Sequence, residues 1–519
     1  MTASPTPDYE DLFKLVHENR LDDEDAQANL APAANASYAS TSSSRFYPRS
    51  VRFHDGTLFA LVESNGLRAL LCFARSGHLP GDLGAASSAA AGFEIALLHP
   101  GWESFLLLRE RFPFTAPVSL REQRTTIGTG DRLGRATPGH IRAVLPYPVS
   151  PVLAQQSVRE LVLTKRTYRD VVADAAFGVF QEGFESGYGA DGDHLKTIAD
   201  IDVALDADMP MITLDLTEVM DPSPAEWSIA EIESRFAQLD SDTRAIVEGS
   251  YTDKSFDVEG EAISVPRDEA RRCALMYWRA LDFAVEVDRH LRARRGDSYD
   301  LEISIDETTA PTLPSHHLFI ARELSRRGVT VSSIAPRFIG EFQKGVDYIG
   351  DLNEFERQFG THCRIARSNG GYKVSIHSGS DKFAVYPSIG EHTNMRVHVK
   401  TAGTSWLEAI RTISSIDPEL YRLMHRKAFD HFEEATKLYH ITADLSRIAN
   451  LETVSDSNLP EYLQKNESRQ LLHITYGGLL NDPEVRPKFF EFLDDNEESY
   501  YDGVGAHIER HIRKLGISS

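Results

Sequence analysis

The stretch YKVSIHSGSDKFAVYPSIGEHTNMRVHVKTAGTSW, residues 372–406, contains two short strand-like runs that each end in polar residues. The first, 373–377, leads into Ser-Gly-Ser-Asp-Lys, and the second, 395–400, leads into Thr-Ala-Gly-Thr. In the second run three apolar residues alternate with Arg396, His398 and Lys400, which places the polar side chains on one face of a strand. Burying such a face is costly unless it borders a polar cavity. The stretch therefore predicts a sheet whose strands present side chains to a site.

Further strand-like runs occur on both sides of this stretch. They lie at 125–134, where a short strand runs into a glycine turn, and at 177–183, 211–215, 301–307, 329–334 and 438–442. Helical patterns separate most of them. Eight strands that alternate with helices predict an α/β fold, a (β/α)8 TIM-type barrel, in which functional groups gather at the C-terminal ends of the strands. A doubly wound open sheet is the structural alternative.

The chain divides into three parts by composition. Residues 1–44 are rich in Ala, Ser, Asn and Asp and are predicted to be a flexible lead-in with one amphipathic helix at 9–18. Residues 45–117 are predicted to form a small N-terminal α+β extension. The barrel catalytic domain is expected to span 118–519, with a long helical region at 223–295 that is partly an insertion.

Composition limits the class of protein. The 519 residues are 41% hydrophobic and 26% charged, as expected of a globular chain. The net charge of −23 argues against nucleic acid and anionic membranes as partners, but a small anionic substrate needs only a local group of cations. Three scattered cysteines, Cys72, Cys273 and Cys363, predict a reducing compartment without disulfides. With no signal peptide or bilayer-length apolar run, we expect a cytoplasmic protein of unknown oligomeric state.

Three histidines lie at or just after three predicted strand ends: His194, His377 and His398. Imidazoles that converge from separate strands suit a catalytic Zn²⁺ or similar divalent ion with an open position for substrate. Because the chain contains 19 histidines, roles other than metal binding remain open for each of them. The pair His316-His317 opens a predicted helix, where a capping or surface role is expected.

Two carboxylates are candidates for proton transfer. Asp193 and Glu307 follow different predicted strands, and moving protons on two sides of a substrate needs two such groups. In the alternative, Asp193 caps the helix that follows it, because Asp is a favoured N-cap residue. Asp306 and Glu307 could equally be a rim pair satisfied by backbone amides.

Two glycine-rich turns have the character of anion cradles, at 128–134 and 379–382. Neither matches a Walker A loop or a dinucleotide fingerprint, so no nucleotide cofactor is expected. Arg337 and Lys344, in another polar loop, could bind substrate or pair with Glu341 and Asp347. The candidate substrate-binding residues are Asp131, Arg132, Lys196, Asp381, Lys382 and Lys400.

Several phrases of the chain together resemble the tagaturonate epimerase family. They are GDRLGRATPGHIR, VFQEG followed by GADGDHLKT, SIDETTAPT, IAPRFIGEFQKGVDYIGD, YKVSIHSGSDKFAVYP and HVKTAGTSWLEA, which cover roughly 125–409. The resemblance implies a metal-dependent epimerase that inverts C4 of a ketohexuronate and interconverts D-tagaturonate and D-fructuronate. The long N-terminal lead-in has no place in the family pattern.

The resemblance also implies roles for residues. Asp193 is the proton acceptor, and an acid from the fourth predicted strand is the proton donor. We choose Glu307 as donor and keep Glu302 and Asp306 in reserve. His194, His377 and His398 hold one divalent ion, such as Zn, Ni or Mn. The carboxylate of the substrate would lie on Lys or Arg, for which Arg132, Lys196, Lys382 and Lys400 are the candidates.

The chemistry of the implied reaction leaves two routes open. The C4 hydrogen of a 2-ketohexuronate is not α to the ketone, so simple enolisation does not invert C4. Either the C3–C4 bond breaks by retro-aldol cleavage or the carbonyl first migrates to C3, and both routes use a divalent ion and two proton carriers. A metal-dependent aldolase or ketose isomerase on the same barrel is the alternative function. A non-catalytic sugar-acid binding protein is the other.

Overall fold

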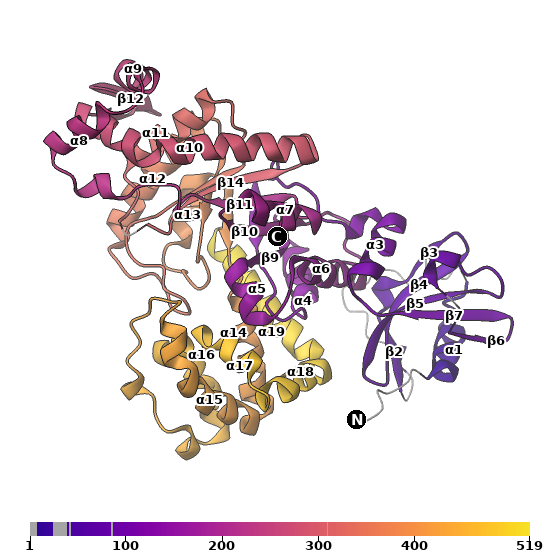
Figure 1. Ribbon diagram of the computed structural model, residues 1–519. Coiled ribbons are helices and arrows are strands. Elements are labelled where there is room, and N and C mark those ends of the chain that lie inside the picture. The colour runs from indigo at the N-terminus through magenta and orange to yellow at the C-terminus, as the bar shows by residue number, and fades with distance from the viewer. Residues whose placement is uncertain (1–7, 24–38, 41–42, 85–86, 309) are drawn as a thin grey trace.

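A computed structural model describes residues 8–23, 39–40, 43–84, 87–308 and 310–519. At its centre eight parallel strands close into a barrel in the order β10-β11-β14-β15-β16-β17-β8-β9 (Figure 1). These strands are β8 (Thr125–Gly128), β9 (Ser150–Ser157), β10 (Gly189–Leu195), β11 (Met211–Asp215), β14 (Asp300–Ile305), β15 (Ser333–Pro336), β16 (Lys373–Ile376) and β17 (Val397–Lys400). The predicted (β/α)8 barrel is therefore confirmed.

Two of the eight predicted strands are wrong. Residues 177–182 of the run predicted at 177–183 belong to helix α6 (Tyr168–Glu182), which begins with a capping box at Thr167 and Asp170 and is capped at its C-terminus by the left-handed Gly183. Nearly every side chain from 171 to 182 is buried there, so the helix carries no clear polar stripe that would reveal its period. Residues 438–442 contain no strand. The run predicted at 329–334 forms a strand only from Ser333 onward.

The two strands that replace them are β9 and β10. Strand β10 contains two glycines that serve close packing. A Cβ on Gly189 would lie 2.9 Å from Cγ2 of Val152, and one on Gly192 would lie 2.9 Å from Cβ of Ala204. Glycine in a strand often marks such a close approach.

Helices surround the barrel and connect its strands (Figure 1). They are α4 (Thr137–Val144), α5 (Val158–Thr164), α6, α7 (Ile198–Asp206), α10 (Arg267–Arg295), α11 (Pro314–Arg326), α12 (Leu352–Ser368), α13 (Tyr386–Thr393) and α14 (Thr404–Ile416). Between β11 and α10 the chain adds η4 (Ser223–Glu226), α8 (Ile229–Phe236), α9 (Ser241–Ser250) and the antiparallel hairpin of β12 (Lys254–Val258) and β13 (Glu261–Val265). The region 223–295 is thus mostly helical, as expected, but a hairpin interrupts it.

The N-terminal part is a separate antiparallel sheet beside the barrel (Figure 1). Its strands are β1 (Ala39–Ser40), β2 (Ser44–Phe46), β3 (Arg52–His54), β4 (Thr57–Ser64), β5 (Leu67–Arg75), β6 (Ser88–Ala90) and β7 (Phe93–Leu98). The predicted helix at 9–18 is confirmed as α1 (Tyr9–Glu18). Most of the lead-in predicted at 1–44 lies outside the described residues. Helix α3 (Trp102–Arg111) and the short turns η1 (Pro48–Ser50), η2 (Gly81–Leu83) and η3 (Pro113–Thr115) complete this part.

The C-terminal helices form a second apolar core on another side of the barrel. They are α15 (Pro418–Thr436), α16 (Asn466–Ile474), α17 (Tyr476–Asn481), α18 (Val485–Asp495) and α19 (Glu497–Lys514), with η5 (Leu445–Arg447), η6 (Leu451–Thr453) and η7 (Asp456–Gln464) between them. The Trp406 indole N–H donates to the carbonyl oxygen of Leu472 over 2.8 Å, which ties α16 to the barrel helix α14. Glu497 at the start of α19 accepts from Tyr47 of the N-terminal part over 3.0 Å.

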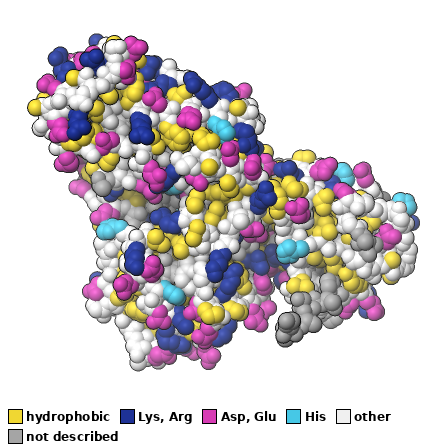
Figure 2. Space-filling model, viewed as in Figure 1, with side chains coloured by type: hydrophobic (Ala, Val, Ile, Leu, Met, Phe, Trp, Pro, Cys, Tyr) yellow, Lys and Arg dark blue, Asp and Glu magenta, His cyan; other side chains and the backbone are white. Residues whose placement is uncertain are grey.

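On the face seen in Figure 2, acidic and basic side chains are interspersed over the barrel and the C-terminal helices. No helix in the described part of the chain is long and apolar enough to cross a bilayer.

Candidate active site

A cavity of about 630 Å³ opens at the C-terminal ends of the barrel strands. Asp193 and His194 reach it from β10, His377 from just after β16 and Lys400 from the end of β17. Asp306 and Glu307 reach it from the residues after β14. This is the end of a (β/α)8 barrel at which the connecting loops place catalytic groups.

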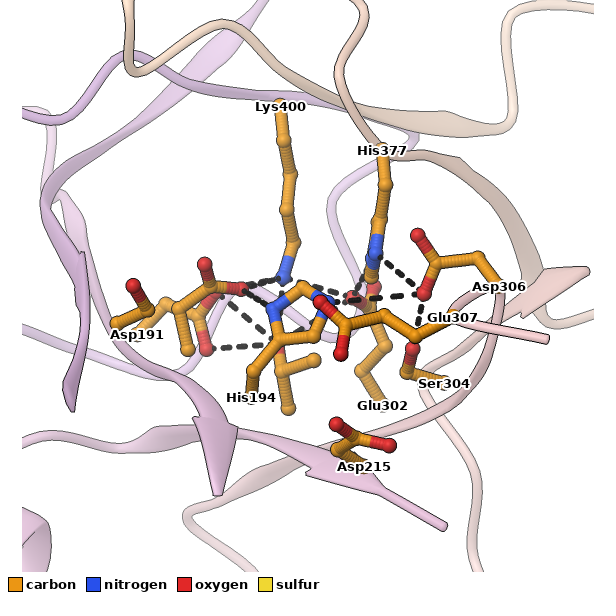
Figure 3. A network of polar contacts seen from close by, with 12 residues as sticks. Asp191, His194, Asp215, Glu302, Ser304, Asp306, Glu307, His377 and Lys400 are labelled. Atoms are coloured by element: carbon orange, nitrogen blue, oxygen red, sulfur yellow. Dashed lines mark hydrogen bonds and ion pairs between the residues drawn. The ribbon is translucent and has the colours of Figure 1, made fainter. Parts of the chain in front are cut away.

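Lys400 lies at the centre of a buried polar network (Figure 3). Its Nζ is 2.6 Å from Oδ1 of Asp193, 2.9 Å from Oδ2 of Asp191 and 2.9 Å from Oε1 of Glu302. It also donates to the Thr213 hydroxyl over 2.6 Å. Four strands, β10, β11, β14 and β17, therefore meet at one ammonium group inside the barrel.

The charges around Lys400 set the protonation of its neighbours. Burial lowers the pKa of Lys400, but its three carboxylate neighbours outweigh burial and hold that pKa well above its ordinary value. Burial raises the pKa of Asp193, but His194 and Lys400 outweigh it and hold the pKa well below its usual range. Burial raises the pKa of Asp191 to about 6 in spite of Lys400. Asp193 is therefore the more acidic carboxyl group of this pair.

His194, His377 and Asp306 form a group whose candidate ligand atoms all lie within 4.8 Å of one another. Oδ1 of Asp306 is 3.1 Å from Nδ1 of His377 and 3.6 Å from Nε2 of His194. Figure 3 shows the three side chains directed toward one another. Nitrogen and oxygen donors at this spacing are suited to a divalent ion.

The charge balance of the site favours a cation at this group. Four carboxylates, those of Asp191, Asp193, Glu302 and Asp306, face the single ammonium of Lys400 in this network. Burial lowers the pKa of His194, yet Asp193 and Asp306 outweigh it and raise the pKa well above its ordinary value. The negative field that raises this pKa would also attract a metal ion, which takes the place of a proton on an imidazole.

A bulge in β10 brings two adjacent side chains into the cavity. The pairing of β10 with β11 shifts between Gly192 and Leu195, and His194 has a left-handed backbone with φ of 58°. Consecutive residues of a regular strand point to opposite faces, so without the bulge only one of Asp193 and His194 would face the site. A left-handed backbone at a residue other than glycine costs about 1–3 kcal/mol and is typical of functional sites.

The alternatives for the two candidate acids are resolved by these positions. Thr197, not Asp193, is the N-cap of α7, so the capping interpretation of Asp193 is wrong. Asp306 accepts from the Ser304 hydroxyl and faces both imidazoles, which differs from a rim pair held by backbone amides. Oε1 of Glu307 lies 4.0 Å from Nε2 of His194, and its side chain is 42% exposed at the cavity wall.

His398 lies deeper in the barrel than the other two histidines. Its Nδ1 is 2.9 Å from the Thr126 hydroxyl, and it is outside the group formed by His194, His377 and Asp306. Burial lowers its pKa to about 3, so the ring is neutral. Asp306, and not His398, is the third member of the group whose candidate ligand atoms all lie within 4.8 Å of one another.

The six candidate substrate-binding residues fall into two sets. Arg132, Lys196 and Lys400 line the cavity. The other three have internal partners and do not line it. Asp131 accepts from three backbone N–H groups of its own turn, Lys382 donates to three backbone carbonyls, and Asp381 pairs with Arg469 over 2.9 Å. The glycine-rich turns at 128–134 and 379–382 are therefore stabilised by internal hydrogen bonds and ion pairs.

One histidine of the cavity has no signal in the sequence. His473 comes from α16 in the C-terminal helices, and neither of its ring nitrogens has a hydrogen-bond partner among the described residues. Nη1 of Arg132 is likewise buried without one. Lys344, noted in the sequence as a possible substrate contact, lines the same cavity and donates to the Ser378 hydroxyl over 3.1 Å.

The pair His316-His317 opens helix α11, as expected, but a surface role is wrong. Both side chains are buried. His317 bonds to His362 and to the Tyr372 hydroxyl at 2.9 and 2.8 Å, so the helix is anchored by its first turn.

Comparison with known proteins identifies the family. The family model described as tagaturonate epimerase matches residues 47–515. A Thermotoga maritima protein named tagaturonate/fructuronate epimerase is 43% identical over 426 residues, which cover 82% of this chain and 88% of that protein. The native crystal structure of the fructuronate-tagaturonate epimerase from Cohnella laeviribosi is 42% identical with a TM-score of 0.86 and covers 95% of this chain and 99% of that chain.

A glycerol complex of the Cohnella enzyme is 44% identical, with a TM-score of 0.86 over 91% of this chain and 96% of that chain. All of these relatives are named as epimerases, so this chain is an enzyme of the isomerase class. The resemblance found in its sequence phrases is thereby confirmed, and the chain belongs to the tagaturonate epimerase family.

Proposed function

We propose that this enzyme is a metal-dependent epimerase that inverts C4 of a ketohexuronate and interconverts D-tagaturonate and D-fructuronate. The observation that carries the proposal is the joint presence, in one cavity, of the His194–His377–Asp306 group and the Lys400–Asp193 pair. The names of the relatives supply the substrate pair.

We infer that His194, His377 and Asp306 hold the divalent ion, with His398 as the alternative third ligand implied by the family resemblance. A divalent ion bound there supplies a Lewis acid for neighbouring hydroxyl and carbonyl oxygens of a sugar. Glu302 supports this group from beneath, since its Oε1 lies 2.7 Å from Nε2 of His377. Such an outer partner orients an imidazole and increases its basicity as a ligand.

Asp193 is proposed as the proton acceptor and Glu307 as the proton donor. His194 and Lys400 keep Asp193 ionised, which is the form that accepts a proton. Glu307 lines the cavity, whereas Glu302 is fully buried between Lys400, Ser333 and His377 and does not line it. The choice of Glu307 over Glu302 rests on this access.

The two proton carriers serve either chemical route. In retro-aldol cleavage, Asp193 takes the proton of the C4 hydroxyl, the C3–C4 bond breaks to an aldehyde and an enediolate, and the rotated aldehyde is attacked again before the proton returns. In carbonyl migration, Asp193 and Glu307 move protons between carbon and oxygen at C2, C3 and C4. Both routes leave the composition of the sugar unchanged, as an epimerase requires.

The carboxylate of the substrate has cationic partners in the cavity wall. Arg132 and Lys344 both line it, and burial together with Arg132 lowers the pKa of Lys344. Arg132 pairs with Glu160 through Nε and Nη2, and its Nη1 is left without a hydrogen-bond partner among the described residues, so this N–H can donate to an anion. We propose that these two residues, with His473 beside them, receive the substrate carboxylate.

The test is metal analysis of the purified enzyme followed by incubation of chelated and metal-restored samples with each ketohexuronate. We expect about one divalent ion at the barrel group per chain and interconversion of the two substrates only with metal. Accumulation of three-carbon fragments would point to an aldolase, and a shifted carbonyl as end product would point to an isomerase. Binding without turnover in any metal state would contradict catalysis.

A cytoplasmic location is also proposed. Its support is the state of the three cysteines, which are all free and buried. Disulfides are characteristic of oxidising compartments.

A further inference from the structure

A second group of metal-binding side chains lies outside the barrel cavity, between helices α10 and α11. Its members are Glu269, Cys273 and His316, whose candidate ligand atoms all lie within 4.8 Å of one another. Glu269 and Cys273 are four residues apart on α10 and therefore share one face of that helix. His316 lies in the first turn of α11, opposite that face.

The ring of His316 has the orientation expected of a metal ligand. Its Nδ1 is 2.8 Å from the Tyr277 hydroxyl, which fixes the plane of the ring. Its Nε2 is buried and lies 2.9 Å from Oε1 of Glu269, a direct contact that a metal ion held between the two groups would replace. A ligating histidine usually has one ring nitrogen held by such an outer partner while the other binds the metal.

The three side chains are mostly buried but have one route to solvent, as in an enclosed ion site. The Cys273 thiol is fully buried and the His316 side chain is 8% exposed, whereas the Glu269 side chain is 18% exposed and opens a path to solvent. Glu269 accepts from the Ser315 hydroxyl over 2.9 Å, and its other oxygen is 3.7 Å from Arg272. Arg272 is held mainly by backbone carbonyls of 224–227, so the carboxylate does not depend on it.

We propose that Glu269, Cys273 and His316 form a second divalent-cation site, separate from the catalytic group, with the thiolate, imidazole and carboxylate donors that Zn²⁺ prefers. Three protein ligands leave one position of a tetrahedron for water. Binding converts the thiol to a thiolate and releases one proton to solvent, so no other co-reactant is needed. Of the two candidate metal-binding groups, this one contains a sulfur ligand and the barrel group does not.

The site would act on the active centre through the chain that connects them. Asp306 and Glu307 lie on the segment that runs from β14 into α11, and His316 lies nine residues after Glu307. An ion shared by α10 and α11 would fix the far end of this segment, which is also held by bonds between Thr312 and Arg337. We therefore assign the site a structural role rather than a place in the reaction.

The decisive probe is Co²⁺, loaded into the full-length enzyme after chelation. A thiolate-to-cobalt charge-transfer band in the near ultraviolet reports sulfur ligation and is silent for the barrel group. We expect the band in the wild type and in His377→Ala, which lacks a barrel ligand. It should vanish in Cys273→Ser and persist in Cys363→Ser, a matched control that removes another buried thiol.

A measurement on the unaltered chain guards against misfolding of the variants. Zn²⁺ should slow alkylation of Cys273, read by mass spectrometry of its peptide, at least tenfold relative to chelated enzyme, while Cys72 and Cys363 stay unchanged. The absence of both the band and the protection overturns the second site. Catalytic metal dependence is judged separately by turnover, so failure of one proposal leaves the other distinguishable.

Discussion

The ammonium of Lys400 lies 2.6 Å from the Asp193 carboxylate inside the barrel, although the two residues are 207 positions apart in the chain. The same ammonium contacts Asp191 and Glu302, so one cation holds three carboxylates in the interior. Removing one partner of a buried ion pair leaves uncompensated charge, which is more costly than the pair itself is stabilising. The protonation and position of the proposed proton acceptor therefore depend on Lys400.

Replacing Lys400 by Met is expected to lower kcat at least a hundredfold and to destabilise the fold by about 3–5 kcal/mol, as loss of one buried ion partner does. Steady-state kinetics and urea unfolding measure the two effects. Lys437→Met removes an exposed lysine that pairs with Glu434 and should change neither. A Lys400→Met enzyme with wild-type kcat would remove this residue from the mechanism.

Asp193→Asn preserves the shape of the side chain but removes its capacity to accept a proton. We expect a loss of about 10²–10⁴-fold in kcat, the usual contribution of a general base. Metal content should stay at the wild-type level, because Asp193 is outside the proposed ligand group. Turnover within twofold of wild type, measured at saturating substrate, would show that another group accepts the proton.

The ligand set is tested by metal analysis of single variants after dialysis. Asp306→Ala and His377→Ala should lose most of the barrel ion, because each removes one of three converging donors. His398→Gln should retain it, since His398 bonds to Thr126 and lies outside the group. Metal loss in His398→Gln with retention in Asp306→Ala would reverse this assignment in favour of the third histidine.

Lys344→Met tests the proposed carboxylate contact. Loss of one charge-assisted hydrogen bond costs about 1.5–3 kcal/mol, so KM for both ketohexuronates should rise about tenfold to a hundredfold with kcat little changed. Lys488→Met, at an exposed position of α18, is the matched control. If KM is unaffected while kcat falls, Lys344 acts on the reaction and not on binding.

Acid sensitivity of the fold should come from buried neutral histidines. Burial lowers the pKa of His425 from 6.5 to about 4, and its Nε2 has no hydrogen-bond partner among the described residues. The unfolded chain binds the proton first, so the stability due to the neutral ring is present above pH 6.5 and is lost as pH falls toward 4.

His425→Phe keeps the ring contacts with Tyr421 and Phe429 but removes the titration. Urea titrations between about pH 4.5 and 6 give the slope of the unfolding free energy against pH. In His425→Phe this slope should be smaller by about 1.4 kcal/mol per pH unit, because unfolding then takes up about one proton fewer. The exposed His78→Gln should leave the slope unchanged. An unchanged slope in His425→Phe would mean that this ring does not remain neutral in the folded state.

The sequence by itself determined the fold class and much of the site. Alternation in 395–400 and the apolar runs at 211–215 and 301–305 are local signals, and each is a barrel strand or the greater part of one. Chemistry at the ends of correctly predicted strands placed Glu307, His377 and Lys400 in the cavity. Asp193 and His194 also line it, although the strand predicted before them is part of helix α6. These signals hold because a strand's period and its polar end are properties of neighbouring residues.

Only the tertiary structure decided which of these residues act together. The bulge at His194, the glycines of β10 packed against neighbouring elements and the burial of all faces of α6 depend on contacts between distant segments, so the local pattern misassigned both elements. Asp306 lies in the group with His194 and His377. Asp131, Asp381 and Lys382 have internal partners instead of facing the cavity. A buried charge is costly unless a compensating group lies beside it. The compensating group often lies far away in the sequence, so a local sequence pattern does not reveal it.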